Sequence, residues 1–213
     1  MPQPPDFDDA FRNRFHDLLV WRRDVRRFRS DALPPGAMEE LIAEAALAPS
    51  VGHSQPWRFV TVSDPARRAA VREDYLACNR EALNDYEGER AKLYATLKLS
   101  GFDTAPNHLA VFVDNATNNG HGLGRKTMPE MLPYSVVIAI HTLWLAARAR
   151  NIGVGWVSIL DPENIRFILE TPEDWALVAY LCVGYPQEEH TDPELERHGW
   201  QDRDPQAYAL LKR

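Results

Sequence analysis

The sequence predicts an α+β sandwich in which helices lie on both sides of one sheet. Two observations support this fold class. Four short segments rich in apolar and β-branched residues alternate with segments of helical periodicity. One of the four, 177–183, is a continuous apolar run, as expected of a strand that is buried on both faces. The length of 213 residues is close to that of one domain, so we expect a single domain over 1–213.

Periodicity and turn residues define the elements of the N-terminal half. Phe11, Phe15, Leu18 and Leu19 recur at helical spacing, and Pro49 is expected to end the second helix. The predicted elements are, in order, a helix at 8–20, a helix at 38–48, a loop at 50–56, a strand at 57–62 and a charged helix at 64–86.

The C-terminal half is predicted by the same signals. Thr127 and Glu130 have the spacing of a capping box, although Pro133 offers a later start for the helix that follows them. A helical excursion is predicted at 87–101 and a turn at 103–107, so that 87–107 is a candidate lid. The elements predicted after it are a strand at 109–114, a glycine-rich loop at 115–126, an apolar helix at 134–150, a strand at 154–160, a helix at 161–169, a strand at 177–183 and an irregular tail from 187.

Composition narrows the classes of function. A formal net charge of −7 and a pI near 5.5 argue against nucleic-acid binding, which requires a broad basic face. The longest apolar stretch, 134–149, is shorter than the roughly 20 residues of a membrane span, and it predicts a buried helix at the domain centre or at a dimer interface. Two cysteines and no secretory signal predict a cytoplasmic protein, and the seven histidines show no metal-ligand spacing.

The most distinctive segment is 21–29, in which five arginines surround one acid, Asp24. Arginine forks bind phosphate oxygens in pairs, so the segment predicts a site for a small anion such as a phosphate ester. Arg22 and Arg23 have a second interpretation, since cations at the end of a helix complement its dipole. Asp24 either pairs with a neighbouring arginine or faces a substrate as a proton acceptor or donor.

Two further segments carry polar groups suited to a ligand. The loop in 48–59 presents Ser50, Ser54 and Gln55, whose hydroxyl and amide groups can hydrogen-bond the edge of a polar heterocycle. Ser158 lies in the apolar stretch 153–160, which favours a buried hydroxyl aimed at a ligand. The chain contains no GxGxxG, Walker, GxSxG or HExxH motif.

Together and in this order, the three segments resemble the nitroreductase-like flavoprotein superfamily and, within it, the 5,6-dimethylbenzimidazole synthases. The similar stretches are RRDVR, APSVGHSQPWRF, GLGRKTMPEM followed by YSVV, and ARNIGVGWVSIL, so the resemblance covers nearly the whole chain. Asp24 occupies the position at which generic nitroreductases carry serine, as it does in the synthases. The resemblance implies a mixed, mainly antiparallel sheet and an intertwined homodimer with flavin sites between the subunits.

The resemblance also implies a set of site residues. Asp24 and Ser158 would be catalytic. The residues that would contact FMN are Arg22, Arg23, Asp24, Val25, Arg26, Ser50, Ser54, Gln55, Ser158 and Arg197. One departure is His53, which stands where many members of the superfamily have asparagine, and it is either a polar contact or a surface residue.

The implied reaction is the oxygen-dependent fragmentation of reduced FMN to 5,6-dimethylbenzimidazole, the lower ligand of cobalamin, and D-erythrose 4-phosphate. Reduced FMN would be the substrate, O2 the co-substrate, and a separate NAD(P)H-dependent flavin reductase the supplier. Two alternatives stay open from the sequence. One is an NAD(P)H-dependent nitroreductase or flavin reductase that recycles FMN, and the other is a flavin-binding protein without catalytic activity.

Overall fold

The computed structural model describes residues 3–97 and 101–213 and contains the predicted sheet. Its four strands are β1 (Trp57–Thr61), β2 (Asn107–Asp114), β3 (Gly153–Val157) and β4 (Trp175–Gly184), in the spatial order β1-β2-β4-β3. All three strand pairs are antiparallel. An isolated parallel bridge joins Asp24 to Val154 in β3, so the arginine segment runs alongside that strand.

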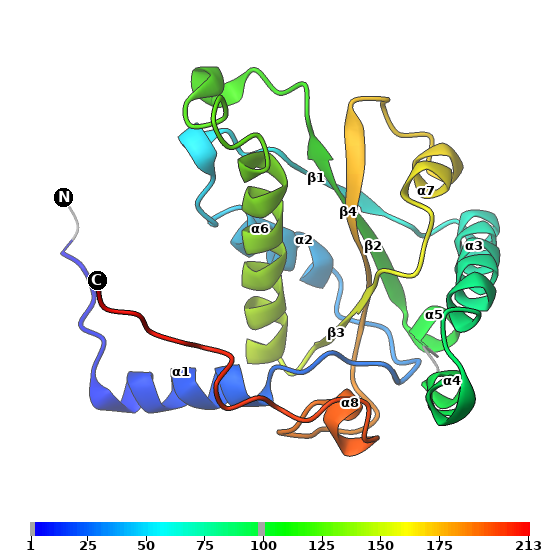
Figure 1. Cartoon of the computed structure of the whole chain (residues 1–213). Coiled ribbons are helices and arrows are strands. Elements are labelled where there is room, and N and C mark those ends of the chain that lie inside the picture. The colour runs from blue at the N-terminus through cyan, green and yellow to red at the C-terminus, as the bar shows by residue number, and fades with distance from the viewer. Residues whose placement is uncertain (1–2, 98–100) are drawn as a thin grey trace.

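Helices cover both faces of the sheet, as predicted (Figure 1). The longer helices are α1 (Asp9–Trp21), α2 (Ala37–Ala45), α3 (Pro65–Leu83), α4 (Gly88–Thr96), α6 (Met131–Ala149) and α7 (Pro162–Ile168). The shorter elements are α5 (Gly101–Thr104), α8 (Glu194–Arg197) and the 3-10 turns η1 (Val51–His53) and η2 (Asn119–Gly122). Figure 1 shows α2 and α6 on one side of the sheet and α3 and α7 on the other.

The alternation of side chains along β2 divides the core into two layers. Leu109 and Val111 belong to the cluster under α2 and α6, whereas Ala110 and Phe112 belong to the cluster under α3 and α7. All four residues are fully buried. The central strands are therefore apolar on both faces, which explains why β4 appears in the sequence as a continuous apolar run.

Several predicted boundaries are wrong. The turn predicted at 103–107 is shorter than expected, because α5 ends at Thr104, Pro106 forms a bend and β2 begins at Asn107. Thr127 does not cap the apolar helix, because α6 begins at Met131 without a side-chain cap and has Pro133 in its first turn. The predicted excursion at 87–107 contains α4 and α5, and its residues 98–100 lie outside the described part of the chain.

The strand predicted at 154–160 ends at Val157. The chain then turns toward α3, where the backbone N–H of Asp161 donates to the buried carboxylate of Asp74 at 2.9 Å. Asp161 also caps α7 by accepting from the N–H groups of Glu163 and Asn164. These contacts draw residues 158–161 away from β4, so apolar content alone misplaced the end of the strand.

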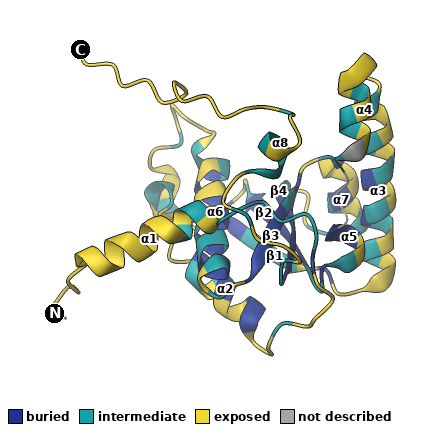
Figure 2. Cartoon of the chain, turned by 90° about the horizontal axis from the view of Figure 1, so that it is seen from below, coloured by how far each residue is buried: buried dark blue, intermediate teal, exposed yellow. Residues whose placement is uncertain are grey.

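Two helices expose apolar side chains. α6 is long and apolar enough to cross a membrane by length and composition, but one of its faces is buried against the sheet while Tyr134, Val137 and Ile138 are exposed. None of the residues of α1 is buried, although Phe11 and Phe15 are apolar. Figure 2 shows α1 extending away from the body of the protein as an exposed arm.

Close backbone approach fixes the arginine segment beside β3. The N–H of Val25 donates to the carbonyl of Val154 at 3.0 Å. A Cβ atom added at Gly155 would lie 2.1 Å from the carbonyl oxygen of Val25, a distance that no side chain tolerates. Gly155 is therefore required for this contact.

We predict that Gly155→Ala lowers the free energy of unfolding by about 2–3 kcal/mol, because the clash is with backbone that cannot rotate away. Chemical denaturation measures the effect. Gly36→Ala is the matched control, since its Cβ meets no atom within 4 Å and only its left-handed φ of 85° is penalised. Equal stability losses in the two variants would contradict the role assigned to Gly155.

Candidate active site

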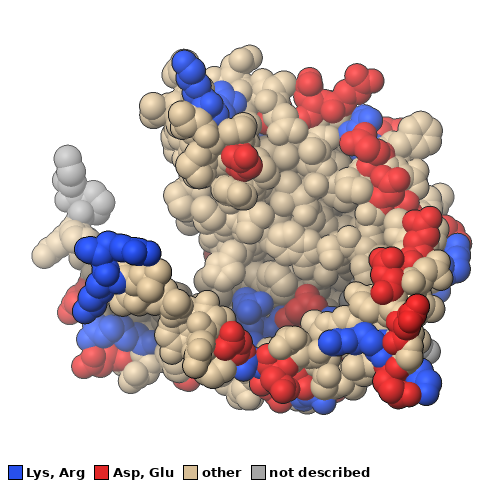
Figure 3. Space-filling view, in the orientation of Figure 1, with Lys and Arg blue, Asp and Glu red and all other residues tan. Residues whose placement is uncertain are grey.

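The arginine segment lines a cavity at the C-terminal end of α6. Its total empty volume is about 540 Å³, including space open to solvent. Figure 3 shows basic and acidic atoms side by side in a hollow of this face. The residues of the segment that line it are Trp21, Arg22, Arg23, Asp24, Val25, Arg26 and Arg27, and Arg197 joins them from α8.

Asp24 is held in place by its backbone and by its side chain. Its Oδ1 accepts the N–H of Trp156 at 2.9 Å, and its Oδ2 lies 3.6 Å from Nε of Arg26. Burial raises the pKa of the Asp24 carboxyl, while the Trp156 hydrogen bond and the charges of Arg26 and Arg22 oppose that shift. The carboxylate neighbours an arginine and Asp24 also lines the cavity, so both interpretations of the sequence stay open.

The side chains of Arg22 and Arg23 make different contacts. The guanidinium of Arg22 stacks over the ring of Trp144 in α6, with its central carbon 5.0 Å from the ring centroid. Arg23 donates to the carbonyls of Val20 and Leu19 and so caps the C-terminal end of α1. Burial, followed by the charge of Arg22, lowers the pKa of Arg23. The helix-end interpretation therefore applies to Arg23, while Arg22 is directed to the cavity.

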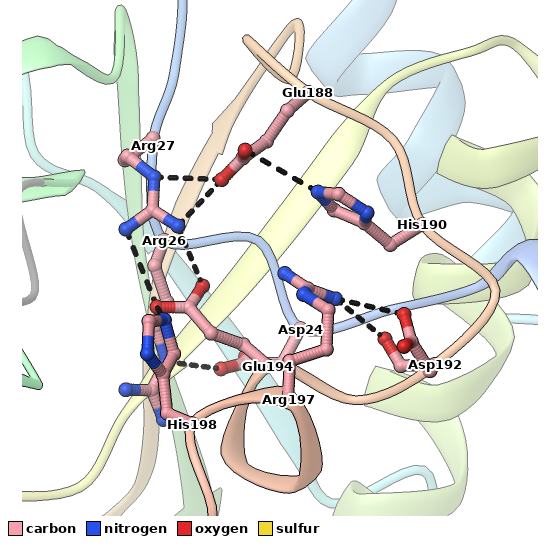
Figure 4. Close-up of polar contacts among 9 residues, drawn as sticks. All are labelled: Asp24, Arg26, Arg27, Glu188, His190, Asp192, Glu194, Arg197 and His198. Carbon is pink, nitrogen blue, oxygen red and sulfur yellow. Dashed lines mark hydrogen bonds and ion pairs between the residues drawn. The ribbon is translucent and has the colours of Figure 1, made fainter.

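The remaining arginines of the segment have acidic partners. Arg27 donates through Nε to Glu188 at 2.7 Å and through both terminal nitrogens to Glu194 at 3.1 and 3.2 Å (Figure 4). Arg29 pairs with Asp31 at 2.8 Å on the exposed surface. These carboxylates offset part of the mutual repulsion of five guanidinium groups in one short segment.

Arg197 is the only predicted site residue from the C-terminal quarter of the sequence, and the fold brings it to the same cavity. Its NH1 donates to the carbonyl and the carboxylate of Asp192, at 2.9 and 3.0 Å. Its guanidinium therefore has an intramolecular acid as partner, and a phosphate would have to replace that acid.

The predicted polar loop lies away from this cavity in the same chain. The N–H of Val51 donates to Oγ of Ser135 near the start of α6, whereas Trp144, nine residues later, donates to the carbonyl of Arg23. At 1.5 Å per residue these two points are roughly 14 Å apart along the helix. The loop 50–56 thus lies toward one end of α6 and the arginine segment toward the other, as the ribbon also shows (Figure 1).

Within the loop, the three predicted residues have different surroundings. Ser50 Oγ accepts the N–H of Gln55 at 3.0 Å, which shapes the turn. Ser54 is buried, and its Oγ has no hydrogen-bond partner among the described residues. Gln55 is exposed and contacts His53, which is itself on the surface with a φ of 56°. Exposure in one chain leaves both alternatives for His53 open, since a surface residue of this loop can still contact a ligand.

The prediction that Ser158 is a buried hydroxyl is wrong. Ser158 is exposed and follows the last residue of β3, for the reason given above. It lies two residues beyond Trp156, whose N–H binds Asp24, and it is not among the residues that line the cavity. Val25 packs its side chain against Gly153, so its contribution to the cavity wall is mainly structural.

Sequence reasoning missed several residues of the cavity. Trp144, Arg148 and Glu194 line it, and Arg148 pairs with Glu189 at 2.7 Å. The tail from 187 onward is polar and lacks periodicity. The contacts of its acids with the arginine segment span more than 160 residues of sequence, so no local pattern indicated them.

The residues fit one end of an FMN molecule. Arg22, Arg26 and Arg197 line the same cavity, and guanidinium groups bind phosphate dianions. The groups expected along the flavin ring belong to the loop at the other end of α6. The two predicted sets of contacts are therefore separated in one chain, and the loop set includes the Ser54 hydroxyl, which has no partner among the described residues.

Comparisons with known proteins show the family of the chain. The model of the nitroreductase family matches residues 19–185. The chain is 57% identical to a 5,6-dimethylbenzimidazole synthase of Rhodospirillum rubrum, over 94% of this chain and 95% of that protein. It is 47% identical to a second one, of Rhodobacter capsulatus, over 94% and 97% of the two chains.

A solved structure of oxidized iodotyrosine deiodinase bound to FMN and 3-iodo-L-tyrosine has the same fold. Its TM-score is 0.69 at 23% identity, and the match covers 92% of this chain and 97% of that one. The family model, the two relatives and the shared fold all indicate the same family. It belongs to the nitroreductase family and, within that family, to the 5,6-dimethylbenzimidazole synthases.

Proposed function

We propose that this protein fragments reduced FMN with O2 to give 5,6-dimethylbenzimidazole and D-erythrose 4-phosphate, with Asp24 as the proton-transfer group. The observation that carries the proposal is the position of Asp24, a carboxyl of raised pKa in a cavity lined by arginines. An acid in that position has little value for binding a phosphate. It has clear value for moving a proton on a substrate that the arginines hold.

The arginines bind and orient the substrate in this proposal. Arg22, already stacked on Trp144, offers its outer edge to the phosphate. Arg197 would bind the phosphate after exchanging its contact with Asp192, and Arg26, whose Nε lies 3.6 Å from Asp24 Oδ2, would be a further contact. The reduced flavin supplies the electrons that O2 accepts, so the protein needs only to position it and to transfer protons.

Asp24 is suited to abstract or return a proton at the ribityl C1′. Trp156 N–H fixes Oδ1, which leaves Oδ2 directed toward Arg26 and the cavity. Because burial raises the pKa of this carboxyl, its ionised form is a stronger base than a solvated aspartate. A separate NAD(P)H-dependent reductase would supply reduced FMN, since this mechanism consumes the flavin.

We further propose that two copies of the chain form a homodimer that completes each flavin site. The two predicted sets of contacts lie at opposite ends of α6, and a twofold axis near the middle of that helix would bring the polar loop of one copy to the arginines of the other. The face over α6 carries few charged side chains in Figure 3. The exposed residues of α1 and α6 supply apolar surface for the contact.

One experiment tests the reaction. The protein is loaded with reduced FMN without oxygen, air is admitted, and dimethylbenzimidazole is measured by chromatography. A parallel assay follows NAD(P)H oxidation with a nitroaromatic acceptor. Benzimidazole formation supports the proposal, whereas NAD(P)H turnover without benzimidazole would identify a reductase, and intact reoxidised FMN alone would identify a binding protein.

We predict that Asp24→Asn reduces benzimidazole formation about a hundredfold or more while FMN affinity changes little, because positioned acid–base groups contribute about 10²- to 10⁴-fold. Asn retains the oxygen that accepts from Trp156. Asp31→Asn, two residues beyond the arginine segment, exposed and paired with Arg29, is the matched control and should keep full activity. Loss of FMN binding with normal turnover per bound flavin would make Asp24 structural.

The raised pKa of Asp24 also sets the direction of pH effects. If its ionised form is the base, activity falls as the pH drops through a pKa above 3.8, and Asp24→Asn abolishes that limb of the profile. For folding, a raised carboxyl pKa means that stability declines as the pH rises through the folded-state pKa. Asp24→Asn should therefore be at least as stable as the wild type at neutral pH.

We predict that Arg22→Ala weakens FMN binding roughly tenfold or more, because a hydrogen bond to a charged group contributes about 1.5–3 kcal/mol. Fluorescence titration with FMN measures the dissociation constant. Arg29→Ala is the control, since Arg29 is bound to Asp31 on the surface. An unchanged dissociation constant in Arg22→Ala would exclude this arginine from the phosphate site.

We predict that Phe15→Glu, on the exposed arm α1, shifts the protein from dimer to monomer and weakens FMN binding at the same time. Sedimentation equilibrium and FMN titration on the same samples measure both. Phe167→Glu is the control, because Phe167 is 79% exposed on α7, away from α1 and α6. A monomeric wild type that binds FMN tightly would refute the dimer proposal.

A further inference from the structure

The C-terminal segment 186–200, called the strap here, is anchored at its start to the arginine segment. Gln187 donates its N–H to the carbonyl of Arg27 at 3.1 Å and its side-chain amide to the carbonyl of Phe28 at 3.0 Å. Glu188 and Glu194 then bind the guanidinium of Arg27 (Figure 4). This end of the strap is thereby fixed beside the cavity.

The other end of the strap is anchored to α4 by aromatic side chains. The ring of Trp200 meets that of Tyr86 edge-on, with centroids 5.4 Å apart, and lies 6.2 Å from that of Tyr94. Tyr86 and Tyr94 stack on each other at 4.9 Å. Arg90 covers the Trp200 ring at 5.0 Å and donates to its carbonyl at 2.9 Å.

Arg197 lies between the two anchors. The N–H of Trp200 donates to the carbonyl of Leu195 at 2.8 Å, so Trp200 folds back onto α8, the helix that ends at Arg197. On the other side, Tyr94 donates to Asn79 of α3 at 2.9 Å, which ties the aromatic contact to the body of the protein. Arg197 therefore lies in the stretch of chain between the contacts of Glu194 and those of Trp200.

We propose that Trp200, with Tyr86 and Tyr94, is a positioning residue for the flavin-fragmenting reaction, because it couples α4 to the strap that carries Arg197. The inference rests on the proposed function and adds to it a determinant outside the cavity, since Trp200, Tyr86 and Tyr94 are not among the residues that line it. When the aromatic contact is intact, α4 and the strap hold one arrangement, and the substrate meets a fixed Arg197.

The chemical consequence is a choice between two outcomes for the same substrate. Reduced FMN that is loosely held passes two electrons and two protons to O2, giving intact FMN and H2O2. Fragmentation requires the flavin to stay in one orientation beside Asp24 and out of solvent. Loosening the strap should therefore divert substrate from fragmentation to simple reoxidation.

The test compares Trp200→Ala with Trp200→Phe and with Phe167→Ala, an exposed aromatic on α7 that serves as control. Dimethylbenzimidazole and H2O2 are both measured per reduced FMN consumed. We expect the benzimidazole fraction to fall about tenfold in Trp200→Ala, with matching H2O2, since small misplacements of a substrate cost this much or more. Trp200→Phe should restore most of the fraction, and Phe167→Ala should match the wild type.

Hydrogen exchange supplies a readout that does not depend on activity. Trp200→Ala should speed amide exchange both in α4 and in the strap around α8, and Glu194→Gln should do the same from the other anchor. If the two residues act through one strap, the double variant should lose no more of the benzimidazole fraction than about the larger single loss. Independent, multiplicative losses would overturn the proposed coupling.

The outcomes separate the two proposals. A wild type that forms no benzimidazole refutes the proposed function, and the exchange measurements then still decide whether Trp200 couples α4 to the strap. If the wild type is active and Trp200→Ala keeps its product ratio, the positioning role is refuted. Exchange that rises in α4 alone, with the strap unchanged, also refutes it.

Discussion

The parallel contact between the arginine segment and β3 is the interaction on which the site depends. The N–H of Val25 donates to the carbonyl of Val154. Because Gly155 has no side chain, the backbone of the arginine segment lies closer to β3 than a residue with a Cβ atom at position 155 would allow. The same contact brings the carboxylate of Asp24 to the N–H of Trp156. Backbone geometry therefore fixes the acid, and the surrounding arginines need not hold it by charge alone.

This arrangement explains why an acid among five arginines has a raised pKa. The nearest guanidinium, that of Arg26, lies 3.6 Å from Oδ2, which is longer than a direct hydrogen bond. Arg27 is drawn away by two glutamates and Arg23 by the end of α1. Burial then outweighs the weakened attraction, and the pKa of Asp24 shifts upward despite the number of nearby cations.

Local patterns predicted most of the fold and part of the site. Apolar spacing identified α1, α6 and β4, and the arginine segment indicated the cavity that contains Asp24 and Arg197. The hydroxyl of Ser158 was misplaced because the end of β3 is set by Asp74, a partner far away in sequence. The pairing of Arg27 with Glu188 and Glu194 was missed for the same reason, since the partners are more than 160 residues apart in the sequence.

The division of the site between the two ends of α6 has a physical origin in the helix itself. Nineteen residues in a rigid rod keep Ser135 and Trp144 apart, so the loop beside one and the arginines beside the other cannot meet within one chain. The exposed Val137 and Ile138 lie between those two positions in the sequence of α6. In the proposed dimer, burying that apolar strip against a second copy would also complete the flavin site, so FMN affinity and dimer stability would be thermodynamically linked.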